Sequence, residues 1–258
     1  MLGLIINESS IVKEILENNN INEKPSVAIS LLVKYFYLKG ITDKLMIQEE
    51  IIKIMSKCDE DFRRSQWEDN IKKTIKTFFS NLKKYNNEVK MIDIDEIIIT
   101  KSEIDEINKL DDKKLRKLSF VLLVYAKVTN IILNREDGWI NQSMTNIFKE
   151  AKVAAKGDDK PLLLHELLRR GYITTSSRVD KTSLKINYVN YDDEPAVTID
   201  DFDGVIYKYL NYMGEKWKRC ECCGEWVKAN KRNNNKYCYD CKKEKELDKY
   251  KKYNTKRK

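Results

Sequence analysis

Apolar residues recur at helical spacing through the first part of the chain and predict a helical domain over residues 1–110. The clearest stripe, within residues 43–58, consists of Met46, Ile47, Ile51, Ile52 and Met55. A second helix is predicted from Pro25, a residue favoured in a first helical turn, to the glycine at position 40. Residues 88–100 alternate or run apolar, which predicts a short strand or an extended connector.

The pattern changes in residues 111–213, which we interpret as a second domain. Residues 112–133 and 139–153 predict two helices, and a third begins at Asp159 and ends at Gly171. Two strands follow, on either side of a polar turn. Residues 198–213 then predict an amphipathic helix. The acidic residues at its start, Asp200, Asp201 and Asp203, are expected to complement the helix dipole rather than to bind a metal.

Three helices followed by a hairpin, with LHELLRRGYITTSSRVDKTSLKINYV at positions 164–189, resemble the winged-helix class of helix-turn-helix proteins. The resemblance covers residues 112–191. It implies that the third helix enters the major groove of DNA and that the hairpin contacts the backbone. The positions it assigns to nucleic-acid binding are Lys160, Arg169 and Arg170 on the helix, and Arg178, Lys181 and Lys185 on the wing. Asp158, Asp159 and Glu166 would repel phosphate, so a structural or protein-binding role stays an alternative.

Composition favours a globular protein with a heavily charged surface, because 41% of the residues are hydrophobic and 35% are charged. No run of about 18 apolar residues exists, and the first residues lack the basic segment of a signal peptide. We therefore expect a cytoplasmic protein without a membrane partner. In that compartment structural disulfides are rare.

Positive charge is concentrated at the C-terminal end. The chain has a net charge of +8, and residues 214–258 contain 16 Lys and Arg but only 7 Asp and Glu. The rest of the chain is therefore close to neutral. This asymmetry indicates a module that meets polyanions, although a solvated helix would show the same composition.

Five of the six cysteines lie in the same module. Cys220 and Cys223 form one C-x-x-C pair, and Cys238 and Cys241 form a second, separated from the first by 14 residues. Two such pairs predict a closed tetrahedral Zn²⁺ site with a structural role, and a redox dithiol is less favoured. A hairpin is expected between the pairs, followed by a helix, an order similar to the treble-clef zinc finger. Cys222 is interpreted as a spare thiol and Cys58 as a core residue.

Basic and aromatic residues are interleaved around the cysteines. The residues predicted to contact nucleic acid are Lys228, Lys231, Arg232, Lys236, Lys242 and Lys243. The alternative is that the module stabilises the fold and that its aromatic rings form a small core.

Catalysis is not expected. The chain has one histidine, His165, and no phosphate-binding glycine loop or nucleophile elbow, although a site made only of carboxylates stays open. The sequence thus predicts a mainly α protein with three parts: a helical domain (1–110), a winged-helix-like α+β domain (111–213) and a Cys₄ module (214–258).

The whole chain is similar to winged-helix and zinc-finger proteins of Gram-positive bacteria and their phages. The leading hypothesis is a DNA- or RNA-binding regulator or replication accessory of a phage or mobile element. The alternative is a factor that binds a host protein or a nucleoprotein complex, for example an inhibitor of a defence machine. The sequence does not specify an oligomeric state.

Overall fold

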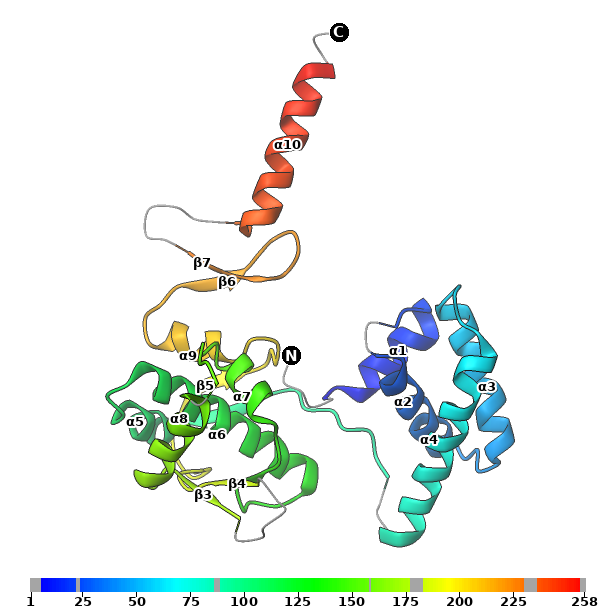
Figure 1. Cartoon of the computed structure of the whole chain (residues 1–258), viewed down its shortest axis with the longest axis horizontal. Helices are drawn as coiled ribbons and strands as arrows, with labels where there is room; N and C mark the ends of the chain where they lie inside the picture. Colours follow the sequence, from blue (N-terminus) through cyan, green and yellow to red (C-terminus); the bar gives the residue numbers. More distant parts are fainter. Residues whose placement is uncertain are drawn as a thin grey trace. The chain divides into compact units, whose positions relative to one another are not determined.

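A computed structural model of the chain describes residues 6–21, 24–85, 89–157, 159–176, 183–229 and 236–255 (Figure 1). Within these ranges the chain forms ten helices and seven short strands, which confirms the prediction of a mainly α protein. The chain divides into two compact units, Ile5–Asp95 and Glu96–Lys258. None of the described helices combines the length and the apolar content that a bilayer span requires.

The first unit is a group of four helices around one apolar core. The helices are α1 (Glu8–Asn18), α2 (Pro25–Leu38), α3 (Lys44–Cys58) and α4 (Arg64–Tyr85). Each contributes one apolar stripe, and the fully buried residues include Ile15, Ile29, Leu32, Ile47, Ile51 and Ile71. The end of the unit is tied to its start, because the Glu8 carboxylate accepts a hydrogen bond from the Ile92 amide at 2.8 Å and pairs with Lys34.

The second unit is built around one long helix, α6 (Lys113–Leu133). Side chains on several sides of this helix are completely buried; they include Leu118, Phe120, Leu122, Leu123, Val124 and Tyr125. A helix that is apolar around most of its circumference is buried by neighbours on several sides. The neighbours of α6 include α5 (Lys101–Asn108), α7 (Met144–Glu150), α8 (Asp159–Arg169) and α9 (Ile206–Tyr212).

A three-stranded antiparallel sheet completes the middle of this unit. Its strands are β2 (Trp139–Ile140), β3 (Ile173–Thr175) and β4 (Leu184–Ile186), in the spatial order β2-β4-β3. The register pairs Trp139 with Lys185 and Ile173 with Ile186. Along the chain the order is therefore helix α6, strand β2, helices α7 and α8, then strands β3 and β4.

Residues 96–110 belong to the second unit, whereas the sequence placed them in the first domain. β1 (Ile97–Thr100) pairs antiparallel with β5 (Pro195–Ile199), with Ile97 opposite Ile199. This pairing joins segments about one hundred residues apart, so a local hydrophobic pattern does not reveal it.

A buried ion pair holds β1 and α5 against α6. The Lys127 ammonium, whose side chain is 2% exposed, lies 2.9 Å from the Glu103 carboxylate. It also donates to the carbonyl oxygens of Ile98 and Asn190 at 2.8 and 2.9 Å. Burial lowers the pKa of Lys127, and the hydrogen bond to Glu103 opposes that shift. Because its partners are satisfied inside the fold, we interpret the pair as a structural crosslink.

The C-terminal part differs from the prediction at residues 198–213. The predicted single helix is wrong, because residues up to Ile199 complete β5 and α9 begins only at Ile206. The strand partner of this segment, β1, lies far away in sequence and overrides the helical pattern. Beyond α9 lie β6 (Trp217–Arg219), β7 (Trp226–Lys228) and α10 (Tyr239–Thr255).

Candidate metal centre and basic surface

Four cysteines meet in the C-terminal part of the second unit. The Sγ atoms of Cys220, Cys223, Cys238 and Cys241 all lie within 4.8 Å of one another. Cys220 follows β6 directly, and Cys223 lies in the turn that leads to β7. Cys238 immediately precedes α10, and Cys241 lies in its first turn. The structure therefore brings together the four residues that the sequence predicted as ligands.

The backbone of the first cysteine pair, Cys220 and Cys223, forms a tight turn whose N–H groups approach the Cys220 sulfur. Gly224 has a φ of 76°, in the region that favours glycine, and its amide donates to the Cys220 carbonyl at 3.0 Å. The Cys238 amide donates to the Cys220 sulfur at 3.2 Å. The backbone N–H of Cys223, together with those of Cys222 and Cys238, lowers the pKa of Cys220 to about 6. The turn thus stabilises a thiolate at position 220.

The four sulfurs fit a tetrahedral metal ion. Sulfurs at ~2.3 Å from a tetrahedral Zn²⁺ lie about 3.8 Å from each other, and the Cys223 and Cys238 sulfurs are 3.6 Å apart. Hydrogen bonds from the Cys241 thiol to the Cys238 and Cys223 sulfurs raise the pKa of Cys241, because they stabilise its protonated form. A metal ion among the sulfurs would take the place of the proton, and four thiolate donors suit a soft or borderline metal.

The other two cysteines lie outside this cluster. Cys222 is exposed, and Cys58 is a half-buried residue of the first unit whose thiol pKa is raised by burial. Neither is among the four sulfurs that approach one another.

The hairpin predicted between the two cysteine pairs, in which residues 225–229 pair with residues 235–237, differs from the structure in its strand partner. Residues of β7 pair with β6, with Trp217 opposite Lys228 and Arg219 opposite Trp226. The first cysteine pair therefore sits at the tip of the hairpin rather than before it. The turn at Cys220–Gly224 connects the two antiparallel strands directly.

Arg219 anchors the hairpin to the residues that precede α9. Its guanidinium pairs with the carboxylates of Asp201 and Asp203 and donates to the Gly224 carbonyl at 2.8 Å. Two of the three acidic residues that the sequence assigned to a helix dipole thus bind a specific arginine, and the third, Asp200, pairs with Lys208 at 2.5 Å. Arg219 is not among the predicted residues, although it directly precedes a predicted ligand cysteine and the chain has an acidic cluster that could pair with it.

The same arginine belongs to an aromatic stack. The guanidinium carbon of Arg219 lies 4.6 Å from the centroid of the Trp226 ring. The Trp226 ring stacks on the Tyr207 ring, with their centroids 5.0 Å apart. Tyr207 also contacts Trp217 at 4.5 Å. Gly204 makes room for this stack, because a Cβ built there would lie 2.6 Å from the Trp226 indole nitrogen. These aromatic rings serve as the small core of the module.

Glu215 is a second anchor. Its carboxylate accepts hydrogen bonds from Lys113 at 2.6 Å, Lys228 at 2.9 Å and the Trp217 indole at 3.0 Å. These donors, Lys113 foremost, lower the pKa of Glu215 to about 2. Lys228, which the sequence assigned to nucleic acid, is therefore engaged in holding β7 to α6.

The basic residues predicted on α8 are also engaged within the protein. Glu166 accepts hydrogen bonds from Arg169 at 2.7 and 2.9 Å and from Arg170 at 2.6 Å. Arg170 also pairs with Asp111 at 3.3 Å. The two arginines lower the pKa of Glu166 to about 2. The positive charge of this helix end is thus largely neutralised by its own carboxylates.

The remaining predicted contacts fall into four groups. Lys160 lies 5.8 Å from the Phe148 ring, and Lys185 is half-buried on β4. Lys236 pairs with Glu221 at 3.4 Å on the surface. Lys242 and Lys243 are exposed on α10, and no carboxylate among the described residues pairs with them. The last group lies outside the described residues and consists of Arg178, Lys181, Lys231 and Arg232.

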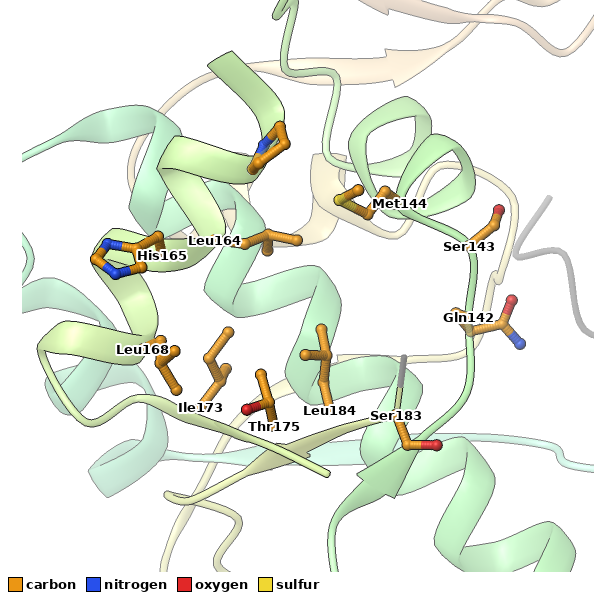
Figure 2. Close-up of a pocket in the computed structure, with 11 residues that line it drawn as sticks. Gln142, Ser143, Met144, Leu164, His165, Leu168, Ile173, Thr175, Ser183 and Leu184 are labelled. Carbon is orange, nitrogen blue, oxygen red and sulfur yellow. The ribbon is translucent and has the colours of Figure 1, made fainter. Parts of the chain in front are cut away.

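A hollow of about 400 Å³ opens beside α8 (Figure 2). Its walls are mainly apolar, formed by Met144, Pro161, Leu164, Leu168, Ile173 and Leu184. Polar groups, among them Gln142, Ser143 and His165, lie around these side chains. An apolar hollow beside α8, the helix predicted to bind DNA, suits an apolar partner better than a phosphate backbone.

Searches of protein-family models, curated proteins and solved structures found no match to this chain. The assignment of a function therefore rests on the geometry and charge described above.

Proposed function

We propose that this chain is a nucleic-acid-binding protein in which a structural Zn²⁺ fixes a basic C-terminal helix. One observation carries the proposal: the four sulfurs of the cysteine cluster meet at the start of α10, where Lys242 and Lys243 are exposed and free of carboxylate partners among the described residues. Four thiolates leave the metal without an open position, so its role is structural. Cys220, Cys223, Cys238 and Cys241 would hold it.

The middle of the second unit supports a winged-helix-like module. Its chain order runs from α6 through β2, α7 and α8 to β3 and β4, and its sheet has the order β2-β4-β3. A long helix, two shorter helices and a terminal hairpin are the features on which the sequence resemblance was based. Fold likeness alone does not assign DNA reading to α8.

Binding is expected to be driven by counterion release from lysines of the C-terminal module. The test is fluorescence anisotropy of the full zinc-loaded chain with DNA and RNA at about 50 to 200 mM salt. We expect affinity to fall steeply with salt. Lys242→Ala/Lys243→Ala should weaken binding and reduce the slope by about 1.4 to 1.8 for two lost phosphate contacts.

The matched control removes two cations that are already paired. Arg169→Ala/Arg170→Ala should change the salt slope much less, because Glu166 holds both guanidinium groups. If the zinc-loaded chain binds neither DNA nor RNA at low salt, the proposal is wrong.

The hollow beside α8 favours a second candidate function, contact with a protein through an apolar surface. Its test is recovery of a nuclease-resistant complex from the native source. Leu168→Asp places a charge in the hollow and should release a partner bound there, whereas Lys242→Ala/Lys243→Ala should leave that complex intact. Retention of the partner by the Leu168→Asp variant would exclude this surface as the contact.

A further inference from the structure

One aromatic ring of the C-terminal module is left in solvent. Tyr239, the first residue of α10, is 80% exposed. Trp217 and Trp226 pack with Tyr207, and the Tyr237 ring lies 3.5 Å from the Lys245 ammonium. Among the aromatic side chains of the module that the structure describes, only Tyr239 has no such role. Its ring is therefore available to a ligand.

Two exposed lysines share the helix face of Tyr239. Lys242 and Lys243 follow it at three and four residues, the spacing that makes helix positions neighbours. Side chains of an α-helix lean toward its N-terminus, so both lysines extend toward the tyrosine end of the helix. Glu246 occupies the same face one turn later and separates these two lysines from the basic residues further along the helix.

Together these residues offer a stacking face and two phosphate contacts within one helical turn. We propose that Tyr239, Lys242 and Lys243 form a binding site for an unpaired nucleotide, whose base stacks on the tyrosine ring and whose flanking phosphates meet the lysines. The inference rests on the proposed nucleic-acid function and specifies its ligand as single-stranded. Both faces of a base inside a duplex are already stacked, so only an unpaired base can lie on the ring. Stacking tolerates every base, so this site carries no sequence preference.

The test compares Tyr239→Ala with Tyr239→Phe in the full, zinc-loaded chain. The probes are a labelled oligothymidine of about 20 nucleotides and a duplex of the same length. Tyr239→Ala should weaken binding to the single strand by about 5- to 150-fold and leave duplex binding nearly unchanged. Tyr239→Phe keeps the stacking ring and should bind the single strand like the parent chain.

Two controls separate stacking from charge and from folding. Lys242→Ala/Lys243→Ala should weaken binding to both probes, because phosphates are common to them. Tyr212→Ala removes an exposed aromatic ring of α9, 48% exposed, and should change neither affinity. Zinc content of each variant reports whether the cysteine cluster is intact.

The outcomes distinguish this inference from the function on which it rests. If the parent chain binds nucleic acid and Tyr239→Ala affects neither probe, or affects both equally, the stacking site is wrong while the proposed function stands. If the parent chain binds neither probe, the proposed function itself fails.

Discussion

The helices α8 and α10 both carry clusters of basic residues, but these residues are paired with carboxylates on α8 and unpaired at the start of α10 among the described residues. On α8, Arg169 and Arg170 converge on Glu166, which lies on the same helix. On α10, Lys242 and Lys243 are exposed and have no carboxylate partner among the described residues. The number of cations on a helix therefore does not measure the charge that it offers to phosphate. Pairing within the protein decides how much is available.

The largest effect is expected from breaking the cysteine cluster at the start of α10. Cys241→Ser should abolish stoichiometric zinc and most nucleic-acid binding, because a structural zinc contributes about 10–16 kcal/mol to the folding of small modules. Elemental analysis and anisotropy measure the two effects. Cys222→Ser is the matched control and should retain one zinc per chain.

If metal-free Cys241→Ser binds nucleic acid as tightly as the parent chain, the contrast drawn between α8 and α10 is wrong. It would mean that the basic residues of α10 act without a fixed platform, as a charged tail does.

A smaller effect, on stability, is expected when the carboxylate partner of Lys228 is removed. Lys228 is one of the cations that pair within the protein. Glu215→Gln should reduce the free energy of unfolding at pH 7 by about 1–2 kcal/mol, because the charged hydrogen bonds from Lys113 and Lys228 are weakened. Urea unfolding measures it. Glu221→Gln, which loosens the exposed pair with Lys236, should cost less than about 0.5 kcal/mol.

Comparison of the parent chain with Glu215→Gln also tests how the free energy of unfolding depends on pH. The pKa of Glu215 is lowered to about 2 in the folded chain, against about 4.3 for an ordinary glutamate. Its stabilising effect is thus complete above about pH 4.3 and is lost as the pH falls toward 2. The stability difference between the parent chain and Glu215→Gln should shrink over that range. A constant difference would contradict the assignment.

The smallest effect is expected from freeing the arginines of α8. Glu166→Gln removes the carboxylate that neutralises them and should raise affinity for DNA at low salt by about two- to five-fold. Anisotropy across a salt series measures the change. No gain would mean that α8 does not face nucleic acid, which favours a protein partner in the adjacent hollow.

Local features of the sequence predicted much of the fold and of the cysteine cluster. The limits of α8 follow from Asp159 and Gly171, and the spacing of the two C-x-x-C pairs predicted the meeting of four sulfurs. Each of these signals lies within one turn or one helix.

Features that depend on distant partners were not predictable in the same way. The pairing of β1 with β5 and the contact of Arg219 with Asp201 require the chain to fold first. The pairing on α8 is different, because Glu166 lies three and four residues before the two arginines. That spacing was sufficient to predict the ion pairs, but Glu166 was considered only as a residue that repels phosphate.

The length of α10 sets the footprint of any strand that lies along it. Seventeen residues of α-helix extend about 26 Å, and each strand of a DNA duplex advances about 3.4 Å along the duplex axis per phosphate. A duplex lying along the whole length of α10 therefore passes about eight phosphates of each strand. Shorter oligonucleotides would engage only its first turns.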